Sequence, residues 1–301
     1  MAMAIERGVQ REYRTMLTDT RRWDRFTARP DDIFVCSPAK CGTTWTQAIV
    51  AALVFDGDVP GQVMELAPWI DARYEPIDAM VDRLDAQAHR RSIKTHTNAD
   101  GIPWYPSVSY IVVGRDGRDA FMSLHNHMSN MRPEFVMELA LSAHAEGIDL
   151  GDATPPPVED IHEFFTWWLN DSMWFDHVAS FWDHRDEPNV CFVHYNDMLD
   201  DLDHEMRRIA KFLNIAIDDA RWPELVGSCT FAAMKQRGDQ IGDLDRAFVG
   251  GADTFLHQGT NARWRAHLTA DEVAAFERRT RELLPPDAQA WTTSGGPTSP
   301  E

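Results

Sequence analysis

The stretch DIFVCSPAKCGTTWTQAIVAALVF, residues 32–55, decides the fold that we expect for this chain. It begins with Asp32–Ser37, a short run rich in apolar and β-branched residues. It ends with Thr43–Phe55, where apolar residues recur at helical spacing and Thr43 or Thr44 is placed to cap the helix. The sequence therefore predicts a strand, a tight turn and a helix in direct succession.

The turn itself, SPAKCGTTW at residues 37–45, has the composition of an anion-binding loop. It offers free N–H groups at a helix start, two hydroxyls, a glycine that permits close approach, and a lysine. It is not a Walker A loop, because Lys40 precedes Gly42 by two positions and the leading glycine is missing. A capped helix with an exposed lysine would explain the same residues, so the turn alone leaves both interpretations open.

Further strand-like and helix-like segments alternate along the chain. The predicted strands are Arg91–His96, Tyr110–Gly114 and Val190–Tyr195. A helix of about ten residues is expected from Arg118, and another from about 202 to 213. This alternation predicts an α/β fold, in which one domain holds a central, mainly parallel sheet flanked by helices, with a P-loop-like first turn.

The aromatic helical stretch at 164–174 is expected to pack against this sheet. The polar segments 147–158 and 236–253 predict surface loops, and the second is either a lid or simply mobile. No internal repeat is visible. We expect one domain over residues 1–285 and a flexible tail over 286–301.

Composition limits the classes of function. The chain has 301 residues, of which 44% are hydrophobic and 26% charged, and a formal net charge of −19. Such a charge argues against nucleic-acid binding, yet a few cations in a cleft can still bind one small anion. The apolar run Ala48–Phe55 is too short to span a membrane, and the N-terminus lacks the apolar segment of a signal peptide. The cysteines form no CxxC pair, so we expect no disulfide framework, no zinc site and a cytoplasmic location.

Chemically active side chains stand at the ends of the predicted strands. Lys94 and His96 end the second strand, Arg115 follows the third, and Tyr195 ends the fourth. Ligands of open parallel sheets bind outside the carboxyl ends of the strands, so these groups should meet at one edge. Ser123 lies about two helical turns beyond Arg115, so both could reach one phosphate. Three other histidines, His125, His127 and His194, have no carboxylate or cysteine partners at metal-ligand spacing, so we interpret them as structural.

Five segments together resemble the cytosolic-type sulfotransferases, which use 3′-phosphoadenylyl sulfate (PAPS) as sulfuryl donor. SPAKCGTTW is similar to the family's PKSGTTW loop and IKTH to its KTH segment, which holds the catalytic histidine. VVGRDGRDAFMSLHNH resembles the segment that binds the 3′-phosphate. VHYNDMLDDLDHEMRRIAKFLNI and FLHQGTNARWRAHLT resemble the YEDM stretch and the RKG segment. The resemblance runs in order from about residue 30 to 285.

The resemblance implies a role for each matching residue. His96 would be the general base, and Lys40 and Lys94 would stabilise the transition state without a metal ion. Arg115 and Ser123 would bind the 3′-phosphate. The resemblance also implies that the desulfated product of PAPS, PAP, binds at this site. The other donor-binding residues that it implies are Lys40, Cys41, Gly42, Thr43, Thr44, Trp45, Tyr195, Phe231, Gln258 and Gly259.

The chain departs from the family pattern at three places. Cys41 stands where the loop usually has serine. His257 and Gln258 replace the arginine and lysine of RKG, so cations are lost near the 3′-phosphate, and Arg263 is a candidate to replace them. The family's dimer motif, KxxxTVxxxE, has counterparts in this chain only at Arg265 and Thr269, so the sequence leaves open whether the protein forms a homodimer.

The acceptor is expected to be a small apolar or aromatic molecule with a hydroxyl group. The segments 64–70, 104–105 and 236–253 match those that line the acceptor site in similar enzymes, although Trp69 and Trp104 could instead anchor loops. Phenols, steroids, aliphatic alcohols and glycolipids all remain open. Two other functions also remain open: a P-loop-type nucleotide kinase, against which the turn sequence speaks, and a protein that binds PAP or PAPS without catalysis.

Overall fold

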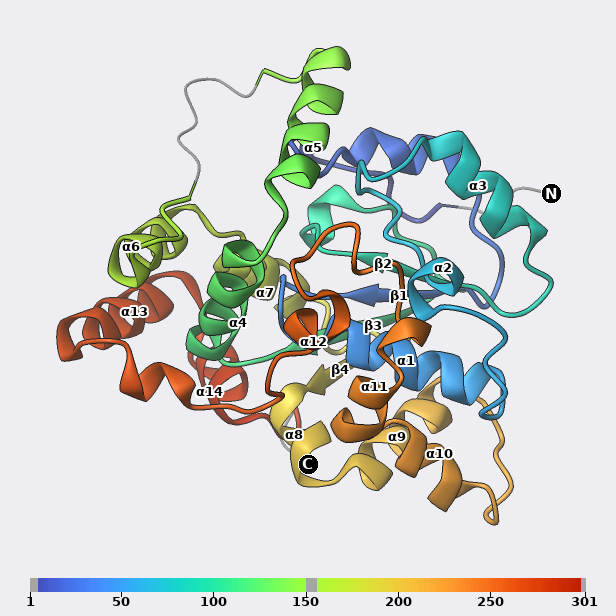
Figure 1. Cartoon of the computed structure of the whole chain (residues 1–301). Coiled ribbons are helices and arrows are strands. Elements are labelled where there is room, and N and C mark those ends of the chain that lie inside the picture. Colours follow the sequence, from blue (N-terminus) through green and yellow to red (C-terminus); the bar gives the residue numbers. More distant parts are fainter. Residues whose placement is uncertain (1–4, 150–155, 299–301) are drawn as a thin grey trace.

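Four short strands form one parallel sheet at the centre of the computed structural model, which describes residues 5–149 and 156–298 (Figure 1). The order across the sheet is β2-β1-β3-β4. Their bounds are β1 Ile33–Cys36, β2 Ser92–Thr95, β3 Ser109–Gly114 and β4 Val190–His194. Each bound lies within one residue of the prediction from sequence, and all neighbouring strands pair in parallel. The predicted fold class is confirmed.

Helices connect these strands and cover the sheet. Those expected from the sequence are α1 Thr43–Val54, α4 Gly117–Ser129 and α9 Leu202–Phe212. The other α-helices are α2 Val63–Leu66, α3 Ile77–Ala86, α5 Pro133–Ala145, α6 Ile161–Asp171, α7 Trp174–Trp182, α8 Tyr195–Asp200, α10 Trp222–Ser228, α11 Phe231–Gln236, α12 Gly251–Phe255, α13 Ala270–Leu283 and α14 Pro286–Ser294. Short 3₁₀ helices are η1 Thr20–Arg25, η2 Ala99–Gly101, η3 Gly238–Gln240 and η4 Arg263–Ala266.

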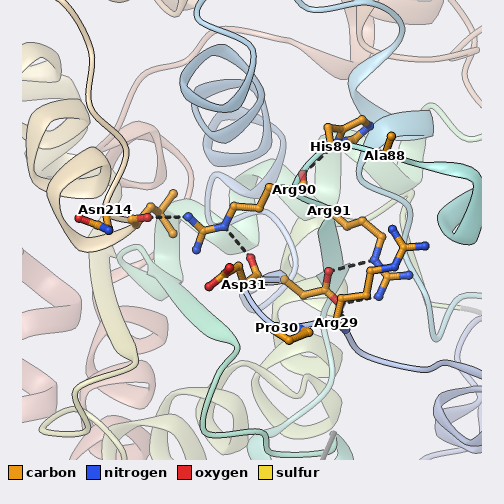
Figure 2. A pocket seen from close by; sticks show the side chains of 10 residues that line it. Arg29, Pro30, Asp31, Ala88, His89, Arg90, Arg91 and Asn214 are labelled. Atoms are coloured by element: carbon orange, nitrogen blue, oxygen red, sulfur yellow. Dashed lines mark hydrogen bonds and ion pairs between the residues drawn. The ribbon is translucent and has the colours of Figure 1, made fainter. Parts of the chain in front are cut away.

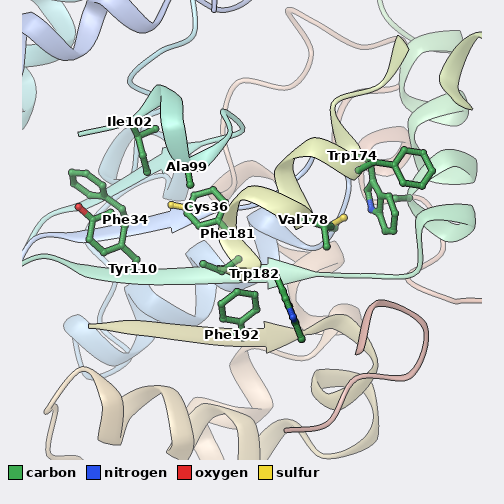
Figure 3. Close-up of a cluster of buried hydrophobic side chains, with 14 of the residues drawn as sticks. Phe34, Cys36, Ala99, Ile102, Tyr110, Trp174, Val178, Phe181, Trp182 and Phe192 are labelled. Atoms are coloured by element: carbon green, nitrogen blue, oxygen red, sulfur yellow. The ribbon is translucent and has the colours of Figure 1, made fainter. Parts of the chain in front are cut away.

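The strands are buried on both faces, and successive residues serve opposite sides of the sheet. One face carries Phe34, Tyr110 and Phe192, which cluster with aromatic side chains of α7 (Figure 3). Aromatic side chains of α6 and α14 belong to the same cluster. The other face carries Ile33, Val35 and further aliphatic side chains, packed under α1, α9 and α10. Figure 1 shows these two helical layers on either side of the strands.

The aromatic stretch at 164–174 packs into the core as predicted, but as two helices. Helix α6 ends at Asp171 and α7 begins at Trp174. The break falls where Ser172 adopts an extended backbone conformation. Phe164, Phe165, Trp168 and Trp174 are all buried, so these rings serve packing.

The C-terminal tail differs from the prediction. Residues 286–294 form helix α14, where a flexible tail was expected, and Trp291 is buried against Trp182 and Phe192. A Cβ at Gly114 would lie 2.2 Å from the Trp291 ring, so the indole packs directly on the end of β3. The contacts of Trp291 with Trp182, Phe192 and the end of β3 therefore hold in place a segment whose composition is that of a loop. Residues 299–301 lie outside the described part of the chain.

The structure describes the two predicted surface loops to different extents. Segment 236–253 contains η3 and the start of α12, and Ile241, Leu244 and Phe248 anchor it in the core. Of segment 147–158, residues 150–155 lie outside the described part of the chain. Across the described ranges, no helix combines the length and the apolar composition needed to cross a membrane.

Candidate active site

The carboxyl edge of the sheet gathers the residues that the sequence analysis singled out. The loop after β1 carries Lys40, β2 contains Lys94 and is followed by His96, Arg115 follows β3, and Tyr195 follows β4. Because the strands are parallel and adjacent in the order β2-β1-β3-β4, their ends lie side by side. The topology thus assembles the predicted site from four separate parts of the chain.

The start of α1 carries no side-chain cap. Its N-cap residue is Gly42, with φ 104°, so the predicted capping by Thr43 or Thr44 is wrong. The Thr43 hydroxyl instead lies 2.6 Å from the Ser37 hydroxyl. The helix start thus keeps its positive end uncapped, which suits an anion.

Glycine is required at position 42. The backbone is left-handed, and a Cβ there would lie 2.8 Å from Cδ2 of Tyr195. The neighbouring Cys41 side chain is fully buried in the core, and burial raises its pKa to about 12. Cys41 therefore faces the interior, where its thiol packs as an apolar group.

His96 is fixed by one ring nitrogen. Nδ1 lies 2.7 Å from the carbonyl oxygen of Ser37, so Nδ1 carries the proton and donates it to that carbonyl. The ring also packs edge-on against Trp69, with centroids 4.5 Å apart. Burial, with a further contribution from Lys94, holds the pKa of His96 well below its usual value. His96 is therefore a neutral imidazole whose Nε2 can accept a proton.

Two lysines share this environment, and neither forms an ion pair with a carboxylate within the described residues, although buried Asp71 acts on Lys94 from a greater distance and raises its pKa. Burial lowers the pKa of Lys94 to about 8, and its ammonium lies 4.6 Å from the centre of the Trp69 ring. Burial, together with Lys94 and Arg115, lowers the pKa of Lys40 to about 7. The positive groups here, Lys40, Lys94 and Arg115, outnumber the one carboxylate among the described residues that acts on the two lysines, an arrangement that attracts an anionic ligand.

Arg115 joins three segments at the other side of the site. Its guanidinium donates to the Asn261 side-chain oxygen at 2.8 Å, to the Thr260 carbonyl at 3.1 Å and to the Lys40 carbonyl at 3.2 Å. It also lies 4.0 Å from the centre of the Tyr195 ring. This arginine is held rigidly beside the loop, a geometry suited to a phosphate.

Tyr195 belongs to a group of aromatic side chains next to Arg115. Its ring packs edge-on against Trp45, with centroids 5.3 Å apart, and the Trp45 indole donates to the carbonyl of Cys229 at 2.7 Å. Phe231 lies further along, and a Cβ at Gly259 would come within 2.6 Å of its ring. The backbone at Gly259 thus lies directly against the Phe231 ring.

Two predicted donor residues make weaker contributions to this arrangement. Gln258 is exposed, and its neighbour His257 is only half-buried. Ser123 is half-buried on α4, and its hydroxyl makes no hydrogen bond within the described residues. The structure brings Lys40, Lys94, His96, Arg115 and Tyr195 to one edge, and leaves the side chains of Ser123 and Gln258 beside it without a hydrogen bond within the described part of the chain.

Comparison with known proteins decides the family. The sequence profile described as the sulfotransferase domain matches residues 30–286. A glycolipid sulfotransferase of Mycobacterium bovis is 34% identical over 313 residues, covering 94% of each chain. The chain belongs to the sulfotransferase family. Human sulfotransferase 1C2 is 25% identical and covers 86% of this chain and 85% of its own. A crystal structure of a mouse sulfotransferase complexed with PAP has the same fold, with TM-score 0.68, 22% identity and coverage of 90% and 91%.

In this sulfotransferase, aromatic side chains extend from His96 to a hollow beside α5. Trp69 lies between His96 and Tyr74, whose rings it meets edge-on at 4.5 and 5.5 Å. Beyond Tyr74 lies a hollow of about 290 Å³, which is lined by Phe135 and Leu139 and also by the charged side chains Arg73, Glu75, Glu138, Glu146 and Arg246. Trp104, by contrast, stacks on Tyr110 at 4.1 Å within the core. Trp69 is thus at the site, while Trp104 anchors a loop.

A second cavity, of about 430 Å³, lies at the opposite end of the strands (Figure 2). Arg29, Arg90 and Arg91 line it, but their guanidinium groups are already engaged. Arg90 donates to the carbonyls of Asp31 and Leu213, both at 2.5 Å, and Arg91 pairs with buried Asp32 at 2.6 Å. These arginines hold the starts of the strands together. Among the described residues, no group of three or more metal-ligating side chains gathers anywhere.

Three further polar residues at this edge, His127, Asn261 and Asn196, were not predicted from the sequence. His127, interpreted as structural, lies 3.1 Å from Lys40 through Nδ1. Asn261 bonds Arg115 and also donates to Asn196 at 2.6 Å. His127 lies four residues after Ser123 on the same helix face, a spacing that could have indicated it. Nothing in the sequence around Asn261 or Asn196 indicates their pairing.

Proposed function

We propose that this sulfotransferase transfers the sulfuryl group of PAPS to the hydroxyl group of an apolar acceptor. The observation that carries the proposal is the neutral His96 beside two lysines at an uncapped helix start. One site then holds a proton acceptor, positive charge and free N–H groups. A sulfuryl transfer needs these three elements, because its loose transition state is stabilised mainly by position and charge.

The residues present fit the donor. The left-handed turn at Gly42 and the start of α1 suit the 5′-phosphosulfate, held by the loop backbone from Lys40 to Trp45. Arg115 suits the 3′-phosphate, with Ser123 as a second contact from α4. Tyr195 and Phe231 would contact the adenine, and Gln258 and Gly259 would lie over it. Nε2 of His96 would accept the acceptor's proton, while Lys40 and Lys94 neutralise the developing negative charge.

Arg263 would supply part of the positive charge that His257 and Gln258 lack. It begins η4, which packs on α4, the helix that carries Ser123. Its charge lowers the pKa of His257, after the larger effect of burial, which indicates that the guanidinium lies near this segment. Within the described residues, Arg263 has no ion pair.

The acceptor is proposed to carry an extended apolar part. The rings of Trp69 and Tyr74 lie between His96 and the hollow, where Phe135 and Leu139 offer apolar contacts among charged side chains. The similarity to a glycolipid sulfotransferase makes a glycolipid the first compound to test.

Two measurements test the proposal. Calorimetry should show that PAP binds, with 5′-AMP as the matched ligand that lacks the 3′-phosphate. Radiolabelled PAPS should then transfer label to at least one member of a panel of phenols, steroids, aliphatic alcohols and glycolipids. PAP binding without transfer to any acceptor would favour a binding protein, whereas turnover of ATP would favour a kinase.

A further inference from the structure

Two side chains from outside its own loop hold Lys40 in place. Its Nζ lies 3.1 Å from Nδ1 of His127 on α4, and 4.6 Å from the centre of the Phe255 ring in α12. The backbone of Lys40 is left-handed, with φ 68°. The loop therefore fixes the backbone of Lys40, and side chains of α4 and α12 fix the position of its ammonium group.

His127 is itself fixed by its surroundings. Its ring packs against Phe248 and Phe255, with centroids 4.6 and 5.8 Å away. Backbone bonds from Val249 to Asn130, at 2.9 Å, and from Arg132 to Ala247, at 2.8 Å, join the same two segments. The imidazole cannot turn away from Lys40 without disturbing this contact between α4 and the segment before α12.

The charges around the pair determine its protonation. Burial and the positive groups Lys40 and Lys94, together with His96, hold the pKa of His127 well below its usual value. Lys40 faces the cations Lys94 and Arg115 and the imidazoles of His96 and His127. No carboxylate forms an ion pair with Lys40 in the described ranges. Neutral His127, with its proton on Nε2, is therefore the hydrogen-bond acceptor available to the ammonium.

We propose that His127 is the positioning residue of Lys40, because it holds the ammonium in its charged form beside the start of α1. The identity of the anion that Lys40 meets there rests on the proposed function. The contact joins two side chains of this chain and does not rest on the proposed function. A hydrogen bond to the charged form raises a pKa, so His127 opposes the effect of the neighbouring cations.

The chain offers a direct test, because it has only four lysines, Lys40, Lys94, Lys211 and Lys235. Labelling lysine with ¹³C gives four Cε signals, and the signal of Lys40 is the one lost in Lys40→Arg. In His127→Phe the pKa of Lys40 should fall by at least about one unit. His127→Asn, which retains an acceptor near the position of Nδ1, should restore most of the shift. His125→Asn is the matched control, since His125 bonds the Val158 carbonyl instead.

The outcomes separate the possible failures. An unchanged Lys40 titration in His127→Phe, or an equal shift in His127→Asn, would overturn the proposal and reduce His127 to a packing residue. Circular dichroism checks that each variant is folded, and His127→Asn still decides if His127→Phe is not. In turnover assays, His127→Phe should lower kcat at least tenfold, about the value of one charge-assisted bond, with a smaller change in PAP affinity. A wild-type protein that fails to bind PAP would reject the proposed function, while the Lys40 titration would still test His127.

Discussion

Nδ1 of His96 is occupied by the Ser37 carbonyl, so an acceptor hydroxyl can meet only Nε2. His96→Asn retains a donor for that carbonyl and removes the base. We expect kcat to fall at least about a hundredfold while PAP affinity stays unchanged, because general-base catalysis contributes about 10²–10⁴-fold. Steady-state kinetics and calorimetry measure the two quantities. His125→Asn is the control on the neighbouring helix, and equal turnover in His96→Asn would dismiss His96 as the base.

The pH dependence of kcat/KM follows from the same residues. The pKa of His96 is depressed, so the base stays neutral well below pH 7. Lys40 and Lys94 must be charged, and their pKa values are about 7 and about 8. Activity should therefore fall as pH rises through this window, since kcat/KM reports the free enzyme. A profile of kcat/KM that rises through the same window would contradict the assignment of the lysines.

The role of single residues was only partly predictable. His96 and Arg115 could be placed because they follow strands of a parallel sheet. For His127, spacing indicates only that it shares a helix face with Ser123, and not its contact with Lys40, 87 positions away. Asn261 could not be placed at all, because its partner Arg115 lies 146 positions away. Spacing along a helix or strand indicates shared faces, but not which distant segment meets them.

At the scale of elements, α14 is the helix whose contribution can be measured most directly. Trp291 packs on Gly114 at the end of β3, on Phe192 of β4 and on Trp182 of α7. Trp291→Ala should lower the free energy of unfolding by about 3–5 kcal/mol, the range for a large aromatic lost from a core. Urea denaturation measures this loss. Trp291→Phe serves as the milder control, and an unaffected midpoint in Trp291→Ala would show that α14 does not stabilise the sheet.

The same helix shows why the sequence could mislead. Residues 286–301 combine proline, glycine and small polar residues, a composition typical of a frayed end. Tertiary contact by Trp291 overrides that local preference. The cap of α1 is a similar case, because Gly42 accommodates Tyr195 and leaves Thr43 free to bond Ser37.

For the molecule as a whole, a ligand that binds only the folded state stabilises it. PAP at a hundred times its dissociation constant should add about 2.7 kcal/mol and raise the melting temperature. In Arg115→Ala most of the rise should vanish, whereas 5′-AMP should stabilise both proteins equally. Asn261→Ala is the control that removes a bond to Arg115 but keeps the charge. An undiminished effect of PAP on Arg115→Ala would remove Arg115 from the 3′-phosphate site.

The architecture itself was largely predictable from sequence. Strands buried on both faces appear as short apolar runs, and a parallel sheet brings their ends together whatever the loops between them do. What the sequence could not supply is the path of the long connections. The hollow beside Phe135 and the contact between α4 and α12 depend on those paths.

Arg115 has a consequence for laboratory evolution of donor preference. One guanidinium fastens the carbonyl of Lys40 to residues 260 and 261, which are far away in the chain. Libraries that randomise 257–263 while retaining this arginine would keep the new sequences attached to the first turn. Libraries that vary Arg115 together with 257–263 would detach this segment from the first turn. In most of their members the segment would be misplaced, and no altered donor preference could be detected.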